Sequence, residues 1–169
     1  MLQRFQTYIK KENLFKSNEK ILLTVSGGID SVVMCDLFFK AKLNFGIAHC
    51  NFQLRDKESD EDELFVEALS EKYGVTFHST EFDTSSYSKK NKLCILVAES
   101  ELRYNWFEEI RKQFSYSFIA TAHHQDDSIE TFFINLIRGA GISGLHGILP
   151  KAGYIIRPML FCNKEAIVT

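Results

Sequence analysis

The residues with the clearest chemical potential form two polar clusters, each directly after an apolar segment. The first cluster reads Ser-Gly-Gly-Ile-Asp-Ser over residues 26–31 and follows the apolar residues 21–25. Glycine lets a ligand approach the backbone closely, and the free N–H groups of a helix N-terminus attract anions. Because Asp30 and Ser31 are good N-caps, we expect a helix from about Val32. The cluster predicts an anion site between a strand and a helix, with a tight turn that binds no ligand as the alternative.

The second cluster occupies residues 121–130 and contains His123, His124, Asp126 and Asp127. Neighbouring side chains on a helix point about 100° apart, so one transition-metal ion could use only two of these four. Hydrated Mg²⁺, which can be held through one carboxylate, fits the pattern better. We expect Asp127 to turn toward the first cluster and hold the metal, while Asp126 caps the helix or serves as a second ligand.

These clusters need a scaffold that brings them together, and the order of the predicted elements supplies one. Predicted strands cover residues 21–25, 43–48, 75–82 and 117–122, and a predicted helix follows each of them. Such alternation is typical of an α/β fold, with a doubly wound, mostly parallel sheet between two layers of helices. The carboxyl ends of parallel strands share one edge, where ligands bind. We therefore expect a single domain over residues 1–169 with both clusters at that edge.

Three further segments carry structural predictions. Residues 83–92 are polar and basic without periodicity, which indicates a mobile surface loop. Residues 95–114 carry an apolar stripe that includes Trp106, which we assign to the core rather than to base stacking. Residues 129–137 form an amphipathic helix whose apolar stripe is expected to face the sheet.

Composition limits the classes of partner. The 169 residues carry a net charge of −2, which argues mildly against a clamp for a long RNA within this chain. The four cysteines are widely spaced without a Cys-x-x-Cys pair, so we expect reduced thiols and an intracellular protein. The sequence shows neither a signal peptide nor an apolar run long enough to span a membrane, and the cytoplasm is the expected location.

The loop at residues 26–31 resembles the signature of the PP-loop, or N-type ATP pyrophosphatase, superfamily. Four further segments, at residues 49–55, 121–131, 136–147 and 157–160, are similar in sequence and order to motifs of the tRNA(Ile)-lysidine synthetase family. The longest of them reads Leu-Ile-Arg-Gly-Ala-Gly-Ile-Ser-Gly-Leu-His-Gly, and the last reads Arg-Pro-Met-Leu. The resemblance covers nearly the whole chain, and the five motifs together are far more specific than any one alone.

The resemblance implies a ligase that joins lysine to carbon 2 of the wobble cytidine in a tRNA(Ile) with a CAU anticodon. ATP adenylates the carbon-2 oxygen, and the lysine amine then displaces AMP. It also implies ATP and Mg²⁺ as cofactors, tRNA(Ile) and L-lysine as partners, no membrane, and a homodimer as one option. Carried onto this sequence, the implied catalytic residues are Asp30, Arg103 and Asp127, the nucleotide-binding residues are Ser26, Gly27, Gly28, Ile29, Asp30, Ser31, His49 and His123, and the metal ligands are Asp127 and Asp126.

Two departures from the family pattern affect these assignments. Where the family usually has Ala-Arg-x-x-Arg-Tyr, residues 99–104 read Glu-Ser-Glu-Leu-Arg-Tyr, so Ser100 replaces the first arginine. Arg103 alone is carried over as a phosphate contact, with a salt bridge on the helix surface as the alternative. The family also has tRNA-binding domains after its catalytic domain, so we interpret this chain as a truncated, N-terminal catalytic domain that ends at Thr169.

Two other functions remain open. A tRNA-thiolating enzyme of the same superfamily usually relies on catalytic or cluster-binding cysteines, and Cys50 is the candidate in this sequence. A non-catalytic module that binds adenine nucleotides would share the fold but would have no need of the aspartate pair in the second cluster.

Overall fold

The computed structural model describes residues 1–53, 57–139 and 146–168. The strands in these ranges are β1 (Ile21–Thr24), β2 (Phe45–Asn51), β3 (Phe77–Glu81), β4 (Phe118–Ala120), β5 (Lys151–Ala152) and β6 (Ile155–Ile156). The helices are α1 (Leu2–Lys11), α2 (Ile29–Lys40), α3 (Lys57–Tyr73), α4 (Thr84–Asn91), α5 (Ile95–Gln113), α6 (Gln125–Ile137) and α7 (Lys164–Val168). None of these helices is both long and apolar enough to cross a membrane. Residues 54–56 and 140–145 of two sequence motifs lie outside the described ranges.

The described strands form one sheet in the order β3-β2-β1-β4-β6-β5. Neighbouring strands are parallel except for the last pair, β5 with β6. In the register of the sheet, Ile21 of β1 aligns with Phe45 of β2 on one side and with Phe118 of β4 on the other. The predicted α/β fold with a doubly wound, mostly parallel sheet is confirmed.

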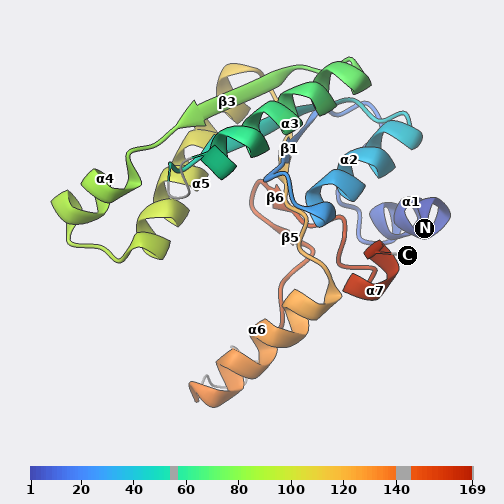
Figure 1. The fold of residues 1–169 in the computed structure, drawn as a ribbon. Coiled ribbons are helices and arrows are strands. Elements are labelled where there is room, and N and C mark those ends of the chain that lie inside the picture. The colour runs from blue at the N-terminus through green and yellow to red at the C-terminus, as the bar shows by residue number, and fades with distance from the viewer. Residues whose placement is uncertain (54–56, 140–145, 169) are drawn as a thin grey trace.

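Two hydrophobic cores cover the two faces of the sheet, because successive side chains of a strand point in opposite directions. Ile21 and Leu23 of β1 belong to the larger core, which also contains Phe38 of α2. Leu22 belongs to the smaller core, which contains Phe107 of α5. Helices α1 and α2 thus lie on one face of the sheet and α5 on the other (Figure 1), as expected for three α/β/α layers. The loop that follows β1 starts at the carboxyl end of this strand.

The prediction of a mobile loop at residues 83–92 is wrong, because this segment contains α4. Asp83 is the N-cap, and its carboxylate accepts a hydrogen bond of 2.9 Å from the backbone N–H of Ser86. Lys92 ends the helix in the left-handed region, with a φ of 55°. The helix has eight mostly polar residues, so it shows no apolar period, and the capping residue was its one local signal. In the next helix, Trp106 packs against the smaller core, as predicted.

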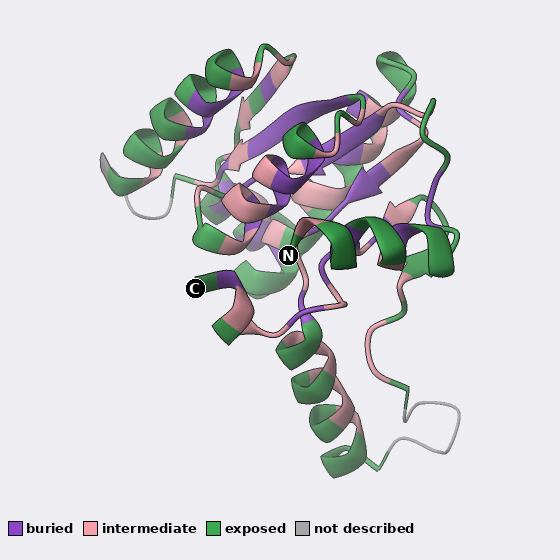
Figure 2. Cartoon of the chain, turned by 90° about the vertical axis from the view of Figure 1, so that its right-hand side faces the viewer, coloured by how far each residue is buried: buried purple, intermediate pink, exposed green. Residues whose placement is uncertain are grey.

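Helix α6 projects from the body of the domain (Figure 1), and none of its residues is buried. The expected contact of its apolar stripe with the sheet is wrong, since the side chains of Ile129 and Phe133 are 48% and 53% exposed. Figure 2 shows exposed or half-exposed residues along the whole helix. An apolar stripe indicates which face of a helix favours burial, but it does not say what covers that face.

Candidate active site

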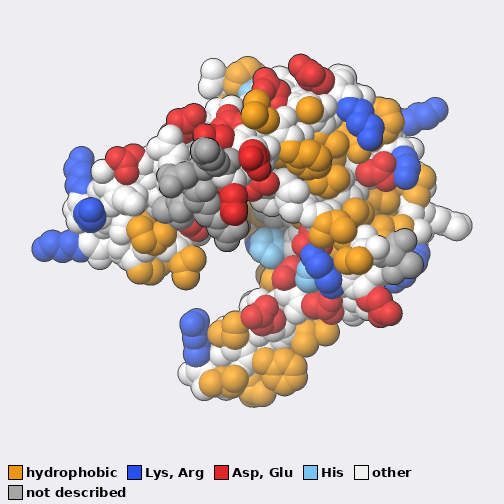
Figure 3. All heavy atoms as spheres, viewed as in Figure 1, with side chains coloured by type: hydrophobic (Ala, Val, Ile, Leu, Met, Phe, Trp, Pro, Cys, Tyr) orange, Lys and Arg blue, Asp and Glu red, His pale blue; other side chains and the backbone are white. Residues whose placement is uncertain are grey.

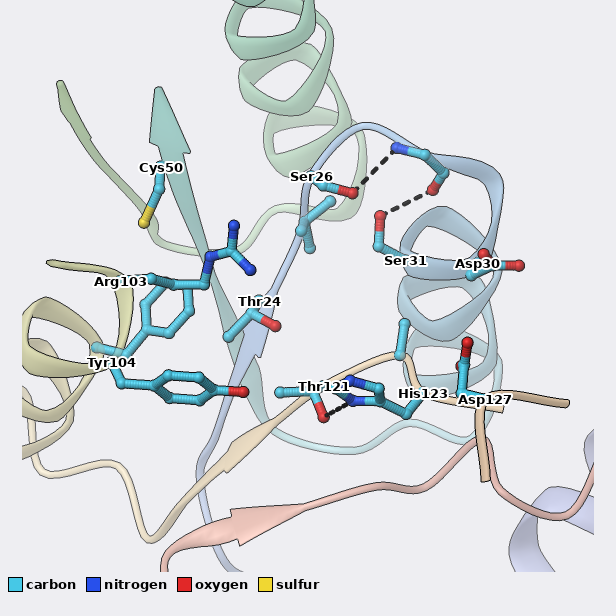
Figure 4. A pocket seen from close by; sticks show the side chains of 14 residues that line it. Thr24, Ser26, Asp30, Ser31, Cys50, Arg103, Tyr104, Thr121, His123 and Asp127 are labelled. Atoms are coloured by element: carbon cyan, nitrogen blue, oxygen red, sulfur yellow. Dashed lines mark hydrogen bonds between the residues drawn. The ribbon is translucent and has the colours of Figure 1, made fainter. Parts of the chain in front are cut away.

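A cavity of about 260 Å³ opens at the carboxyl ends of β1 and β4. Its walls come from the 26–31 loop, from the residues that precede and begin α6, and from α5 (Figure 4). Figure 3 shows the surface hollowed between the α4–α5 arm and α6, with histidine side chains visible in the hollow. The cavity is lined by Thr24, Val25, Ser26, Gly28, Asp30, Ser31, Cys50, Arg103, Tyr104, Phe107, Thr121, Ala122, His123 and Asp127. The structure thus brings together the two clusters that the sequence places at one edge of the sheet.

The 26–31 loop leaves the N-terminus of α2 open. Gly28 is the N-cap and α2 begins at Ile29, so the expected capping by Asp30 and Ser31 is wrong. The Ser31 hydroxyl instead donates a hydrogen bond of 2.8 Å to the carbonyl of Gly28. Among the described residues, no side chain caps the helix and no acceptor bonds the N–H groups of Ile29 and Asp30. These N–H groups and the helix dipole can therefore bind an anion.

Gly27 shapes the loop where it passes α3. Its φ of +92° lies in the left-handed region, and a Cβ at this position would be 2.9 Å from Oδ1 of Asp62. Gly27 and Ile29, whose side chain is 45% exposed, do not line the cavity. Their contribution is the backbone path rather than a side-chain contact. Asp62 is a neighbour of this loop that no sequence motif indicates.

Asp30 lines the cavity but is bound by a residue from the other end of the chain. Nζ of Lys164, the first residue of α7, lies 2.6 and 2.7 Å from the two carboxylate oxygens of Asp30. Figure 4 shows Asp30 on the side of α2 that faces away from Arg103. The paired residues are 134 positions apart in the sequence, which explains why no local sequence pattern reveals the contact.

The N-terminus of α6 has a different arrangement, in which Asp127 rather than Asp126 contributes to the helix cap. His124 is the N-cap, and the carboxylate of Asp127 accepts a 2.8 Å hydrogen bond from the His124 backbone N–H. Asp126 does not cap α6, and its carboxylate accepts a 2.8 Å hydrogen bond from the backbone N–H of Lys164. Asp127 lines the cavity and Asp126 does not. The spacing of the residues could not decide which carboxylate turns back to the cap.

His123 lies directly before this helix and faces the cavity. Its Nδ1 and the hydroxyl of Thr121 share a hydrogen bond of 2.8 Å. Burial lowers the pKa of His123, and the positive charge of Arg157 lowers that pKa further. The imidazole is therefore neutral at physiological pH and can accept or donate one hydrogen bond to a ligand.

Helix α5 supplies the wall opposite α2. Figure 4 shows Arg103 and Tyr104 extending from this helix toward the cavity. The Arg103 guanidinium stacks 4.9 Å from the ring centroid of Phe52, and its nearest carboxylate contact among the described residues is Glu99 at 3.9 Å. At that distance the salt bridge is weak, so the guanidinium keeps its donors for a ligand. This distance argues against the alternative that Arg103 serves only in a salt bridge on the helix surface.

His49 has a structural position rather than one in the cavity. It is 3% exposed, and its Nδ1 lies 2.8 Å from the carbonyl oxygen of Val25. The ring thereby fixes the end of β1, from which the loop starts. It also borders a second recess, beside Ser26 and Asp62.

Metal-binding and sulfur chemistry depend on clusters of particular side chains. Within the described ranges, no group of three or more His, Cys, Asp or Glu side chains is arranged to hold a metal ion. Cys50 lines the cavity, but burial raises the pKa of its thiol to about 12. A thiol with this pKa is almost entirely protonated at neutral pH and is a poor nucleophile.

The whole chain, residues 1–169, matches the PP-loop domain family, and it therefore belongs to that family. The curated relatives that it matches carry the name of one enzyme within that family. The chain is 49% identical over 166 residues to the tRNA(Ile)-lysidine synthase of Bacteroides thetaiotaomicron and 42% identical over 170 residues to that of Chlorobaculum tepidum. These alignments cover 98% of this chain but 39% and 51% of the two relatives. The chain thus spans about half or less of the length of the relatives that it matches.

Solved structures with a similar fold belong to several enzymes. The U34-tRNA thiolase NcsA from Methanococcus maripaludis, with its [4Fe-4S] cluster, has a TM-score of 0.75 at 19% identity. NMN synthetase from Francisella tularensis has a TM-score of 0.62 at 14% identity. Each comparison covers 98% of this chain, and 61% and 66% of the other chain respectively. At these identities the similarity concerns the fold alone.

Proposed function

We propose that this chain is the ATP-binding catalytic domain of a tRNA(Ile)-lysidine synthase, within a longer protein whose other domains bind the tRNA. The observation that carries the proposal is the open N-terminus of α2, in one cavity with Arg103, His123 and Asp127. The relatives named tRNA(Ile)-lysidine synthase support the choice of substrate. The proposed partners are tRNA(Ile) and L-lysine, and the proposed location is the cytoplasm.

The proposed reaction has two steps. The carbon-2 oxygen of the wobble cytidine attacks the α-phosphorus of ATP, an oxygen–phosphorus bond forms, and pyrophosphate leaves. The amine of lysine then attacks carbon 2, AMP leaves with the former carbon-2 oxygen, and the nitrogen loses its proton. Negative charge therefore develops first on the leaving pyrophosphate and then on AMP, and both need positive or N–H partners.

The residues of the cavity fit these needs. The open N–H groups of Ile29 and Asp30 can donate to the pyrophosphate, and the Ser26 hydroxyl lies 3.3 Å from the neighbouring N–H of Gly28. Gly28 lets the pyrophosphate approach these N–H groups. The space beside its Cα is open, since a Cβ built there would have one neighbour, the Ser26 hydroxyl, at 3.4 Å. We assign Arg103, on the opposite wall, to the α-phosphate, where its planar guanidinium can donate two parallel hydrogen bonds.

Mg²⁺ would neutralise charge as the pyrophosphate leaves. The donor set fits a hydrated ion, because Asp127 presents a carboxylate to the cavity and the remaining ligands would be phosphate oxygens and water. One carboxylate oxygen of Asp127 accepts the N–H of His124. The carboxylate still has free lone pairs that can bind an ion. We propose Asp127, and not Asp126, as the protein ligand.

The thiolating alternative has weaker support. The fold is similar to a U34-tRNA thiolase, but that likeness concerns the fold alone. The high pKa of the Cys50 thiol argues against a sulfur relay through this residue. A nucleotide-binding module without catalysis would leave Asp127 in the cavity without a role.

The test uses the full-length protein, a tRNA(Ile) transcript with a CAU anticodon, ATP, Mg²⁺ and isotope-labelled lysine. Mass spectrometry of the digested tRNA should show the labelled lysine on the wobble cytidine, with one pyrophosphate released for each modified tRNA. Incorporation of sulfur would favour the thiolase alternative. ATP binding without pyrophosphate release would favour the non-catalytic module.

A further inference from the structure

We propose that Lys164 is a positioning residue for the nucleotide site, because its ammonium group neutralises Asp30 and so allows the N-terminus of α2 to bind a polyphosphate. This inference rests on the proposed nucleotide binding. It adds a residue that lies outside all five sequence motifs.

One residue connects three helices at the edge of the sheet. The Lys164 ammonium contacts both carboxylate oxygens of Asp30, the second residue of α2, at 2.6 and 2.7 Å. The backbone N–H of Lys164 donates a 2.8 Å hydrogen bond to Asp126, the second residue of α6. Lys164 therefore fixes the start of α7 against the first turns of both helices that begin at the cavity.

The charge on Asp30 presents a problem for anion binding that this contact solves. A carboxylate in the first turn interacts favourably with the helix dipole, but it repels a phosphate bound to the same N–H groups. Among the described residues, the next cationic candidate is Nε2 of His124, which lies 4.0 Å from Asp30, too far for a hydrogen bond. Within the described ranges, Lys164 is thus the residue that pairs with Asp30 at hydrogen-bond distance.

Lys164 acts through Asp30 rather than on the ligand. The cavity is lined by Asp30 but not by Lys164. The side chain of Asp30 is 29% exposed and that of Lys164 is 44% exposed, so solvent screens the pair only in part. Removal of the ammonium group would leave an unpaired carboxylate beside the open N–H groups of Ile29 and Asp30.

The test is calorimetric titration of this chain with inorganic pyrophosphate, without metal and at low salt. Wild type is compared with Lys164→Met, with the conservative Lys164→Arg, and with the double variant Asp30→Asn/Lys164→Met. We expect Lys164→Met to weaken pyrophosphate binding about tenfold, and Lys164→Arg to stay within about twofold of wild type. The double variant should recover to within about threefold of wild type, because the repelling charge has been removed as well.

The double variant separates this role from a structural one. If it binds as weakly as Lys164→Met, Lys164 contacts the anion directly or holds the fold, and the proposal is overturned. Since through-space repulsion is screened by salt, the deficit of Lys164→Met should shrink between 50 and 300 mM salt, roughly in step with the Debye length. Normal wild-type binding with an unaffected Lys164→Met would overturn the role of Lys164 alone, whereas absent wild-type binding would overturn the nucleotide site as well.

Discussion

Two helices begin side by side at the same edge of the sheet, and their first turns differ in almost every respect. Helix α2 follows β1, has a glycine N-cap and leaves its first N–H groups open. Helix α6 follows the neighbouring strand β4, and its first turn already has acceptors. The Gln125 N–H donates a 2.8 Å hydrogen bond to the carbonyl of Cys162, and Asp127 accepts the N–H of His124.

The comparison shows how similar backbones acquire opposite charge preferences. Both N-termini carry the positive end of a helix dipole. At α2 the adjacent acid, Asp30, is paired with Lys164, so the dipole remains available to an anion. At α6 the acids Asp126 and Asp127 compensate the dipole and present carboxylate oxygens instead. One helix start is therefore suited to phosphate and the other to a cation, and the two meet in one cavity.

The largest effect should come from Asp127→Asn in the full-length protein. Asparagine can still accept the His124 N–H, so α6 keeps its cap, but the charge that serves the metal is lost. We expect pyrophosphate release at saturating Mg²⁺ to fall about 10- to 1000-fold, the range for one electrostatic contact in a transition state. The matched control is Asp126→Asn, which should stay within a few-fold of wild type because Asp126 does not line the cavity. An active Asp127→Asn beside an inactive Asp126→Asn would reverse the assignment.

A smaller effect is expected from Gly28→Val at the other helix start. A valine side chain would project where the polyphosphate must approach the N–H groups of α2, while the folded structure has room for it. We expect ATP affinity to fall about 10- to 100-fold, since each lost hydrogen bond to a charged group is worth about 1.5–3 kcal/mol. Calorimetry on folded variants, with Gly28→Ala as an intermediate step, measures the loss. Equal affinity in all three proteins would remove the phosphate site from this loop.

Gly27→Ala tests the loop rather than the ligand. Alanine at a φ of +92° is strained, and its Cβ would lie 2.9 Å from Asp62. We expect the free energy of unfolding to fall by about 1–2 kcal/mol. The control is Gly74→Ala, which has a φ of +65° and no atom within 4 Å of the added Cβ. Denaturant unfolding should show a smaller loss for the control, and equal losses would mean that the approach of Asp62 does not matter.

The smallest predicted effect is a pH dependence at the α6 side of the cavity. Burial lowers the pKa of His123 in the folded chain. Below about pH 6.5, His123 therefore binds a proton more readily in the unfolded chain than in the folded one. Stability should therefore fall as pH decreases from 7.5 to 5.5. Between pH 7.5 and 5.5, the decrease in Tm should be about 1–2 °C smaller in His123→Gln than in wild type. His78 has a lowered pKa as well and remains in both proteins, so an unchanged pH profile would assign the effect to that residue instead.

Much of the fold follows from local sequence, because buried parallel strands and amphipathic helices have characteristic periods. The strand before Ser26 and the helix that contains Trp106 were predictable for this reason. The helix after Asp83 was not, since eight mostly polar residues have no apolar period. The exposure of Phe133 was not predictable either, because the partner of a stripe is a tertiary property.

The candidate site shows the same division. The types and spacing of residues 26–31 and 121–130 were sufficient to place both clusters at one edge of a parallel sheet. The contacts that define their roles are not local, such as the pairing of Asp30 with Lys164 and the approach of Asp62 to Gly27. His49, a residue within a motif, also has a contact that its spacing does not show, since its Nδ1 lies 2.8 Å from the carbonyl oxygen of Val25 at the end of β1.

We propose that the start of α2, and not the start of α6, binds the polyphosphate. This binding site is tested most directly by following the backbone amide resonances of the ¹⁵N-labelled chain during titration with metal-free pyrophosphate. We expect the amides of Gly28, Ile29 and Asp30 to shift most, with dissociation constants that agree with one another. The amides of Asp126 and Asp127 should shift far less, because the acids around them repel the ligand. Larger shifts at the start of α6 than at the start of α2 would mean that the polyphosphate binds at α6 instead.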